Sequence, residues 1–304
     1  MATGNNNSFD VIIVGGSYSG LAAAMGLGRA LRHVLVIDSG LPCNRQTPHS
    51  HNFLTQDGNT PAEIAALARQ QVEAYPTVKF MRAVATRGRK KENGFEIEAD
   101  SGEKFLATKL IFATGIRDIM PDLQGFAECW GISVIHCPYC HGYEVRNEKT
   151  GILANGEAGY DYCALISNWT RDLTLFTNGP AILTSEQISK LERHKIEIVE
   201  TEVRKIEHTN GHIRSIVFKD GRRFELAALY CRPAFQQHCA IPETLGCEMT
   251  EDGYIKTDVL QKTSVPGIYA CGDNSVRMRS VAMAISAGTI AATTVNKEMI
   301  LEAF

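Results

Sequence analysis

The sequence has no excess of charge of either sign. Its 304 residues carry 31 Lys and Arg against 34 Asp and Glu, which gives a formal net charge of −3 and a pI near 6.3. Proteins that bind nucleic acid or anionic membranes through charge alone are strongly basic, so this balance argues against both partners. We therefore expect the binding partners to be small molecules or other proteins.

Long apolar runs are also missing. The longest weakly apolar stretch, 280–295, is rich in Ala, Gly, Ser and Thr, which is too polar a composition for a membrane span. It is more typical of a helix buried against a sheet. The first eight residues lack the basic start and apolar run of a secretory signal, so we expect a cytoplasmic protein.

The cysteines form no disulfide framework. There are nine of them, an odd number, and the only close pair is Cys137-Pro138-Tyr139-Cys140. Half of a zinc site has the same spacing, but a structural zinc needs a second pair of ligands, and His136 and His141 beside the cysteines could not complete a relaxed tetrahedron. We therefore predict no metal and a redox-active pair in preference to zinc or to accidental spacing.

A chain of this length is expected to form about two domains, although no low-complexity linker separates them. An apolar, β-branched run at 9–14 ends in a glycine turn, 15–20, and is followed by a helical segment, 21–31. A second strand at 34–37 closes with Asp38. This order predicts a dinucleotide-binding unit with the phosphates at the helix start and Asp38 on a ribose hydroxyl. Ser17 replaces the usual middle glycine, so an ordinary strand-to-helix turn is the alternative.

The rest of the chain predicts more strands and a second unit of the same kind. Turn signals between 80 and 107 indicate an antiparallel hairpin region, followed by a buried strand at 109–112. A second glycine turn at 154–159 lies between a strand, 151–153, and a helix that extends to about 168. Further segments are a strand at 173–176, a helix at 185–194, alternating strands to about 230 and a strand at 265–273.

Taken in this order, the segments resemble the low-molecular-weight thioredoxin reductases, a group of FAD-dependent disulfide oxidoreductases, over nearly the whole chain. The resemblance implies an α/β fold of two Rossmann-like, three-layer ββα domains, the second inserted into the first. The FAD-binding domain would comprise 1–117 and 246–304. The inserted domain, 118–245, would resemble an NAD(P)-binding domain and carry the cysteine pair. The resemblance also implies a homodimer.

The same resemblance assigns residues to FAD. The assigned residues lie around the predicted unit at the start of the chain, in the segment from 84 to 115 and in the last part of the chain. The implied contacts are Gly15, Gly16, Ser17, Tyr18, Ser19 and Gly20 for the pyrophosphate, Asp38 for the ribose, with Ser39 next to it in sequence, Asn44, Arg45 and Asn52 in the loop beside the flavin, Val84, Thr114 and Gly115, and finally Gly272, Asp273, Arg279, Ser280 and Val281. In that loop His49 and His51 are equally consistent with a solvated polar segment.

The chemistry of the pair agrees with this family. A thiolate at a helix N-terminus has a lowered pKa, because the positive end of the helix dipole favours the charged form. Pro138 suits a first helical turn, where its missing N–H has no partner to lose. By analogy with the family, Cys140 is the sulfur next to the flavin and Cys137 is the outer sulfur that attacks or releases the substrate.

The chain departs from the family at the predicted second nucleotide site. Ala154 stands in place of the first glycine. Thr177-Asn178-Gly179 occupy the position of a His-Arg-Arg run that pairs with the 2′-phosphate of NADPH. NADPH is therefore an uncertain electron donor, unless a loop from elsewhere supplies the contacts.

A second departure follows the redox pair directly. Thioredoxin reductases usually place an aspartate there as proton donor, whereas this chain has His141, which is followed by Gly142, Tyr143 and Glu144. An imidazole titrates near neutrality and suits the same role, although a lone histidine is more often structural. The run is similar to a side branch that contains flavin dithiol oxidases and also to thioredoxin-reductase-like proteins without a known electron donor.

Three functions follow from these observations. The first is a thioredoxin-reductase-like enzyme that acts on a thioredoxin-like protein or a small disulfide. The second is a dithiol oxidase that forms disulfides and reduces oxygen to peroxide. The third is a non-catalytic flavoprotein redox sensor. The apolar tail, 299–304, either continues the last helix or places Phe304 on the flavin.

Overall fold

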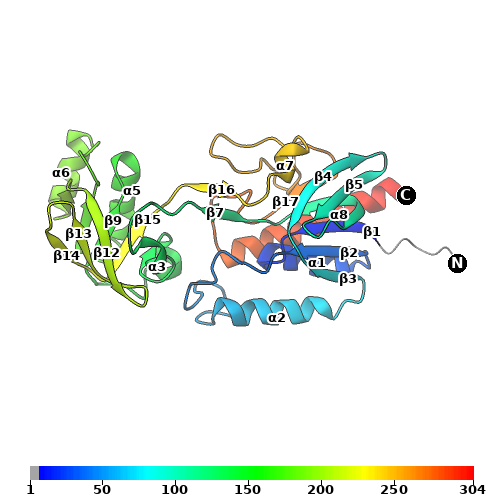
Figure 1. Cartoon of the computed structure of the whole chain (residues 1–304), viewed down its shortest axis with the longest axis horizontal. Coiled ribbons are helices and arrows are strands. Elements are labelled where there is room, and N and C mark those ends of the chain that lie inside the picture. Colours follow the sequence, from blue (N-terminus) through cyan, green and yellow to red (C-terminus); the bar gives the residue numbers. More distant parts are fainter. Residues whose placement is uncertain (1–6) are drawn as a thin grey trace. The chain divides into compact units, whose positions relative to one another are not determined.

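The computed structural model describes residues 7–304, so most of the N-terminal stretch considered above lies outside the described residues. The chain forms two compact units (Figure 1). Unit 1 contains the chain up to Arg45 together with Ala62–Arg117 and Phe235–Phe304. Unit 2 contains Gln46–Pro61 and Asp118–Ala234. Among the described residues, no helix is both long enough and apolar enough to cross a membrane.

Unit 1 is built on parallel strands, of which the central ones, β1 (Ser8–Val14) and β2 (Val34–Asp38), are largely buried. Their side chains are mainly Val, Ile, Leu and Phe, which suit a sheet covered from two sides. All of the predicted strands of this unit are present. The parallel strands are β1 (Ser8–Val14), β2 (Val34–Asp38), β3 (Val78–Arg82), β6 (Lys104–Phe112) and β17 (Ile268–Ala270), with β3-β2-β1-β6 in order and β17 on the other edge of β6.

Helices cover one face of this sheet. The helix α1 (Tyr18–Arg29) packs on α8 (Val281–Ala303), and α2 (Pro61–Glu73) contributes Val72 to the same core. Small residues allow the close approach: a Cβ on Gly26 would lie 2.7 Å from the Cβ of Ala292. The weakly apolar stretch after Ser280 is therefore the buried helix that its composition predicts.

The opposite face of the sheet carries an antiparallel layer. Strands β4 (Ala85–Lys91) and β5 (Gly94–Ala99) form a hairpin that continues into β6, and the short helix α7 (Ile241–Thr244) packs beside it. Gly94 has φ of 133°, a conformation that favours glycine, so the hairpin predicted between 80 and 107 is confirmed, with its turn at Asn93 and Gly94. The unit thus has the three layers of a ββα nucleotide-binding domain.

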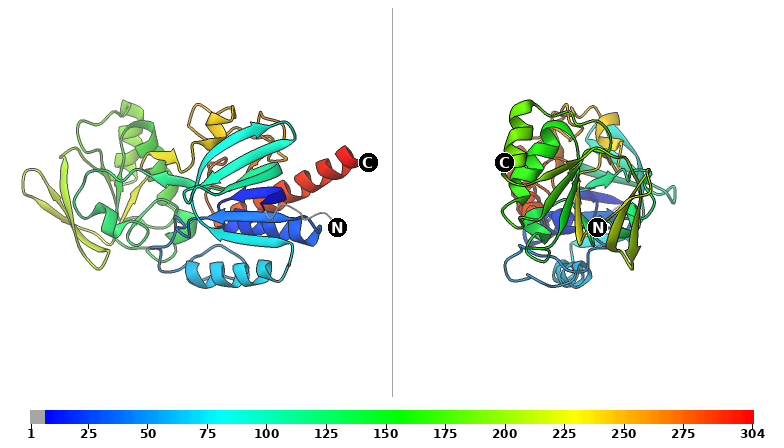
Figure 2. Two further views of the ribbon diagram at one scale, coloured as in Figure 1. Left: turned by 45° about the vertical axis from the view of Figure 1, so that its right-hand side comes forward. Right: turned by 90° about the vertical axis from the view of Figure 1, so that its left-hand side faces the viewer.

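Unit 2 repeats this plan at a smaller scale. Its parallel sheet is flanked by helices, and an antiparallel three-stranded sheet forms a separate layer within the unit (Figure 2). The parallel strands, in order, are β11 (Glu197–Val199), β10 (Leu173–Phe176), β9 (Thr150–Leu153), β15 (Ala228–Cys231) and β8 (Val134–Ile135). The antiparallel strands are β12 (Val203–Thr209), β13 (His212–Phe218) and β14 (Arg223–Glu225), and the helices are α3 (Phe126–Cys129), α4 (Pro138–His141), α5 (Gly156–Ile166) and α6 (Ser185–Arg193).

Two elements differ from the sequence-based expectation, and one open alternative is decided. A two-stranded connection, β7 (Ile116–Asp118) paired with β16 (Phe235–Gln237), was not predicted, because strands of three residues carry no periodic signal. The strand expected at 265–273 is reduced to β17, since Gly267 has φ of 84° and turns the chain. The tail does continue α8, but Phe304 is fully exposed.

Candidate active site

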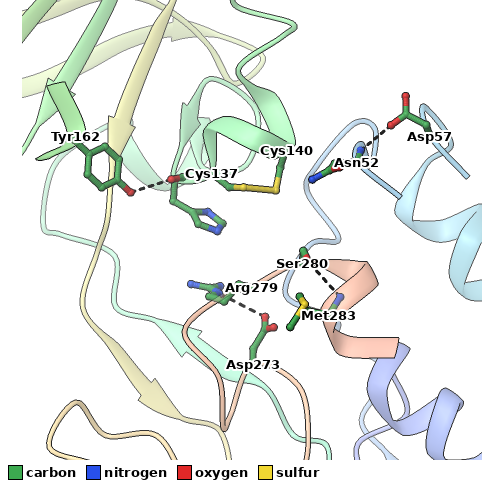
Figure 3. Close-up of a disulfide and its surroundings, with 10 residues drawn as sticks. Asn52, Asp57, Cys137, Cys140, Tyr162, Asp273, Arg279, Ser280 and Met283 are labelled. Atoms are coloured by element: carbon green, nitrogen blue, oxygen red, sulfur yellow. Dashed lines mark hydrogen bonds and ion pairs between the residues drawn. A yellow bond between two sulfur atoms is a disulfide. The ribbon is translucent and has the colours of Figure 1, made fainter. Parts of the chain in front are cut away.

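The two cysteines of the predicted pair are joined as a disulfide in unit 2 (Figure 3). Their Cα atoms are 5.3 Å apart, and both residues are half-buried. Cys137 is the N-cap of α4, and its carbonyl accepts from the N–H groups of Cys140 at 3.2 Å and His141 at 3.1 Å. The predicted helix start is confirmed, but α4 is a single turn of four residues. A single turn aligns only a few peptide dipoles. We therefore expect it to lower the thiol pKa less than a long helix would.

Gly142 fits closely against a tryptophan behind the pair. Its N–H donates to the carbonyl of Pro138 at 2.7 Å, and a Cβ at this position would lie 2.9 Å from Nε1 of Trp169. Trp169 in turn contacts the exposed ring of Tyr139 edge-on, with ring centroids 5.4 Å apart. A larger residue after His141 would push the turn off Trp169, which explains the glycine in the Cys-His-Gly run.

The chain before the pair is held by two aromatic contacts. The hydroxyl of Tyr162 donates to the carbonyl of His136 at 2.9 Å (Figure 3). The ring of His136 stacks on Trp130, with centroids 5.6 Å apart. These contacts give His136 a structural role. Within residues 7–304, no group of three His, Cys, Asp or Glu side chains is arranged to hold a metal ion.

His141 lies in an environment that favours the neutral imidazole. Burial lowers its pKa below the ordinary 6.5, the carboxylate of Glu144 acts in the opposite direction, and the nearby His51 lowers the pKa further. A neutral imidazole can accept a proton from a thiol, so this position suits the predicted proton-transfer role.

The segment that contains His51 belongs to the same unit as the cysteines. Nε2 of His51 lies 3.5 Å from a carboxylate oxygen of Glu144, and Nδ1 lies 3.6 Å from Asp57. His49, by contrast, contacts only the carbonyl of Gly58 through Nδ1 at 2.9 Å among its polar contacts described, a bond that holds the loop together. Of the two histidines that the sequence left open, only His51 is placed beside the redox turn.

Asn52 is placed with the cysteines and not with the other predicted flavin contacts. It has φ of 58°, and its N–H donates to Asp57 at 2.7 Å (Figure 3). All the other residues assigned to FAD lie in unit 1, whereas Asn52 lies in unit 2. Its side chain is exposed.

The first glycine turn leaves the start of α1 open. The N–H groups of Gly16 and Gly40 donate to the two oxygens of Asp38, at 2.9 Å and 3.1 Å. The N-cap Ser17 makes no capping bond with its side chain, and the first turn of α1 contains no acidic residue. The first N–H groups of a helix have no partner within it, so those of α1 are available to an anion.

Asn274 orders the neighbouring loop, and sequence reasoning missed it. It is fully buried, and its amide donates to the carbonyl of Phe112 at 2.8 Å and to the hydroxyl of Thr114 at 3.2 Å. Its Oδ1 has no hydrogen-bond partner within residues 7–304. Beside it, Gly272 has φ of 88° and approaches Ser19 of α1. The tripeptide Gly-Asp-Asn at a strand end was the available signal.

The other predicted residues lie in the same unit with ordinary local contacts. Ser280 caps α8 by accepting from the N–H of Met283 at 3.2 Å (Figure 3). The remaining contacts are Arg279 with Asp273 at 3.5 Å, Asn44 with Tyr18 at 3.3 Å, Arg45 with the carbonyl of Pro42 at 3.1 Å and Val84 with Asp100 at 3.1 Å. Ser39 is exposed, Gly20 lies in α1, Gly115 follows β6, and Val281 is the first residue of α8.

The second glycine turn is closed by its own chain. Asn155 caps α5 by accepting from the N–H of Gly156 at 2.8 Å, and the same oxygen accepts from Ile182 at 2.8 Å. Its amide donates to the carbonyls of Thr177 at 3.3 Å and Pro180 at 2.9 Å. The side chain of Asn155 therefore joins the segment 177–182 to the start of α5 by hydrogen bonds.

Acidic and polar groups complete this closure. Glu157 lies in the first turn of α5 and accepts from Gln187 at 2.6 Å. Asn178 accepts from the N–H of Val203 at 2.7 Å, and the hydroxyl of Thr177 donates to the carbonyl of Gly179 at 2.7 Å. Thr177 and Asn178, at the position where the family's arginines are expected from the sequence, are thus engaged in local bonds.

The comparison with known families agrees with this geometry. A family model described as pyridine nucleotide-disulphide oxidoreductase matches residues 9–288. The chain belongs to this family. It is thus an FAD-dependent disulfide oxidoreductase of the thioredoxin reductase type, as its sequence predicted.

Relatives within this oxidoreductase family are similar over almost the entire chain. Thioredoxin reductase tcpT of Claviceps purpurea is 31% identical over 310 residues, covering 98% of this chain and 96% of its own. Thioredoxin reductase aclD of Aspergillus oryzae is 31% identical, with 96% of each covered. An oxidoreductase structure from Agrobacterium tumefaciens is 37% identical with a TM-score of 0.91, covering 97% of this chain and 99% of that one.

The residues of unit 1 fit the flavin of this oxidoreductase family. The uncapped N-terminus of α1 suits a pyrophosphate, and the carboxylate of Asp38 can accept a further hydrogen bond from a ribose hydroxyl. The buried Oδ1 of Asn274 has no hydrogen-bond donor within residues 7–304 and could accept one from the cofactor. When bound, FAD supplies two-electron oxidation and reduction. The glycine turn, Asp38 and the Thr114 segment would hold it.

Proposed function

We propose that this protein exchanges electrons between FAD and a thiol or disulfide substrate through Cys137 and Cys140. The observation that carries the proposal is the disulfide on a single-turn helix with His141 next to it. Following the family pattern, Cys140 exchanges with the flavin and Cys137 with the substrate. The residues assigned to FAD keep those roles in this proposal.

His141 moves the proton that accompanies each exchange. Reduction of the Cys137–Cys140 disulfide by two electrons requires two protons, and reoxidation releases them. The burial that lowers the pKa of His141 keeps its imidazole neutral near pH 7, so it can accept a proton from a thiol and return it. A protonated imidazole would offer no such acceptor.

We propose further that NADPH is not the efficient electron donor. The closed turn at Asn155 supports this, because the N–H of Gly156 at the start of α5 already has an acceptor, and Ile182 is bonded to the same oxygen. The acidic Glu157 in the same helical turn disfavours an anion. No arginine stands at Thr177, Asn178 or Gly179.

The same closure favours a second candidate, a dithiol oxidase. In this direction a substrate dithiol reduces the Cys137–Cys140 disulfide, becomes a disulfide itself, and loses two electrons and two protons. A bound flavin would supply the route for these two electrons to oxygen, which takes up two protons and becomes hydrogen peroxide. An enzyme that works this way needs no dinucleotide. The hydrogen bonds by which Asn155 closes the second turn would therefore not impair its activity.

Partners and location remain parts of the proposal. A thioredoxin-like protein or a small disulfide would serve as acceptor in the reductase direction, and a small dithiol would serve as donor in the oxidase direction. The relatives named thioredoxin reductase support the former. We also propose a homodimer, a cytoplasmic location, and no nucleic-acid or membrane partner.

Anaerobic titration of the purified flavoprotein tests the direction. NADPH, NADH and a small dithiol are added separately, and the flavin absorbance is followed. We expect bleaching by the dithiol and little by either dinucleotide. Bleaching by stoichiometric NADPH would contradict the assignment of the donor.

Cysteine variants test the route of the electrons. Cys140→Ser should abolish bleaching by dithiol, and Cys137→Ser should abolish substrate turnover. Cys163→Ser, a change at a buried free cysteine, is the matched control and should react like the wild type. Unchanged turnover in Cys140→Ser would remove the proposed function.

A further inference from the structure

Both tryptophans of this chain lie against the redox turn. The sequence contains only two, Trp130 and Trp169. Trp130 stacks on His136, the residue before the first cysteine of the pair, with ring centroids 5.6 Å apart and 22° between the ring planes. Trp169 packs on Gly142, two residues after the second cysteine, where a Cβ would lie 2.9 Å from its Nε1. One tryptophan therefore contacts each end of the segment that carries the sulfurs.

Each tryptophan is itself anchored in unit 2. Trp130 is 8% exposed and also stacks on Phe126 in the core, with ring centroids 5.8 Å apart. The N–H of Trp169 donates to the carbonyl of Ile166, the last residue of α5, at 2.9 Å, and its carbonyl accepts from Asn147 at 3.0 Å. The chain after the redox turn is thus bonded to the backbone of Trp169 as well as packed against its ring.

Trp169 makes a further contact within the pair itself. Tyr139 lies between the two cysteines, and its ring meets that of Trp169 edge-on, with centroids 5.4 Å apart. Because the side chain of Tyr139 is 64% exposed, this contact adds little to the core of the unit. Its effect is to fix the position of the turn.

The helix that carries the cysteines is too short to be stable by itself. α4 has four residues, and forming the first turn of a helix costs more conformational entropy than one hydrogen bond returns. In the oxidised protein the bond between Cys137 and Cys140 closes this turn. Once that bond is reduced, noncovalent contacts must keep the two thiols near each other.

We propose that Trp130 and Trp169 are positioning residues that hold the thiols of Cys137 and Cys140 together and thereby set the reduction potential of the pair. Reduction breaks the S–S bond and adds two electrons and two protons, which gives two thiols. Reoxidation removes them and must bring the sulfurs into contact again. The less freedom the thiols have, the less entropy is lost when the bond closes, so the disulfide becomes more stable. The proposal rests on the proposed function, in which this potential decides which dithiols can reduce the pair.

Equilibration with glutathione measures the effect without turnover. The complete flavoprotein is incubated anaerobically at fixed ratios of reduced to oxidised glutathione, so that reduction of the pair converts two glutathione molecules to one glutathione disulfide. Thiols are then trapped with iodoacetamide, and the oxidised fraction of the peptide with Cys137 and Cys140 is quantified by mass spectrometry. We expect Trp130→Leu and Trp169→Leu each to lower the equilibrium constant for disulfide formation about tenfold, which raises the potential by about 30 mV.

Conservative variants and a matched control separate this role from general stability. Trp130→Phe and Trp169→Phe keep an aromatic ring at each position and should give intermediate shifts. Phe218→Leu is the control, because Phe218 is buried in the same unit and its ring packs on Phe176, with centroids 5.8 Å apart. It should lower the thermal stability and leave the equilibrium constant of the pair unchanged.

The outcomes distinguish the proposal from its alternatives. Unchanged equilibrium constants in both Trp→Leu variants would overturn it, and so would an equal shift in Phe218→Leu, which would show that the constant only follows thermal stability. Where a Leu variant does not fold, the Phe variant at the same position decides, and an unchanged constant there would also overturn the proposal. Absence of turnover in the wild type would contradict the proposed function but leave the shifts in potential intact.

Discussion

The two glycine turns of this chain share one local structure, a strand followed by a turn and a helix. They differ in whether the residue before the helix caps it with its side chain. At the first turn, Ser17 leaves the initial N–H groups of α1 without a side-chain cap, and no acidic residue follows. At the second turn, Asn155 fills the same position on α5 and uses all of its hydrogen-bonding capacity on the chain, with Glu157 close behind.

This difference shows that the topology of a nucleotide-binding unit does not by itself make a binding site. A strand, a turn and a helix bring backbone N–H groups to one place in both units. Whether those groups remain available depends on one side chain, serine in the first unit and asparagine in the second. The glycine positions of the motif do not indicate whether the residue before the helix is serine or asparagine.

The largest expected effect comes from giving the first turn an acidic cap. Ser17→Asp should cap α1 and stabilise the flavin-free protein by about 1 kcal/mol. The negative charge should at the same time weaken flavin binding about tenfold or more, because charge-assisted bonds to a phosphate are worth about 1.5–3 kcal/mol. Flavin content after dialysis and thermal unfolding measure the two effects.

Ser17→Asn is the neutral control for this variant. It should cap the helix without adding charge, so its loss of flavin should be smaller than that of Ser17→Asp. Full flavin content in Ser17→Asp would show that the start of α1 does not hold the pyrophosphate.

The second effect comes from opening the second turn. In the triple variant Asn155→Gly, Glu157→Ser and Ile182→Arg, the cap and the acidic group are removed and a cation is placed on the exposed Ile182. We expect pyrophosphate and NADPH to bind about tenfold more tightly than to the wild type. Isothermal titration calorimetry measures both ligands. Equal NADPH affinity in the two proteins would refute the idea that Asn155 closes this turn.

A smaller effect is expected at the loop that supports the first turn. Asn274→Ala leaves the buried carbonyl of Phe112 and the hydroxyl of Thr114 without their donor. The cost should be about 1–3 kcal/mol of stability, with faster flavin release. Stopped-flow release and urea unfolding measure these quantities, and Asn296→Ala, which loses a bond from Arg32 far from the first turn's loop, is the control.

The smallest effect concerns the cap of α5 alone. Asn155→Ala should destabilise the protein by about 1 kcal/mol, and Asn155→Ser should lose less because serine also caps helices. Urea unfolding separates the two variants. Because serine cannot donate as the amide does to Thr177 and Pro180, a stability equal to the wild type in Asn155→Ser would mean that the amide bonds contribute little.

The fold was largely predictable because its signals are local. Short buried runs such as 9–14 and 109–112 read as strands, and the glycine turns after them mark the helix starts. The composition of 280–295 was sufficient to place α8 in the core. What escaped was the pairing of β7 with β16, since three-residue strands depend on a partner far away in the sequence.

The site was predictable in part for the same reason. Cys137, Cys140 and His141 are adjacent in sequence, so their cooperation could be read directly. Glu144 was visible in the same run, but its contact with His51 joins residues 93 positions apart and has no sequence signal. Asn155 could have been found, because Asn before Gly-Glu at a helix start is typical of an N-cap.

The segment Gln46–Pro61 has a consequence for dissecting the protein. It belongs to the unit of the cysteines, although in sequence it lies between two stretches of the flavin unit. A fragment cut at Asp118 and Ala234 would keep both sulfurs and His141 but leave His51 and Asp57 behind. Grafting the redox function onto another scaffold would therefore require two separate pieces of chain.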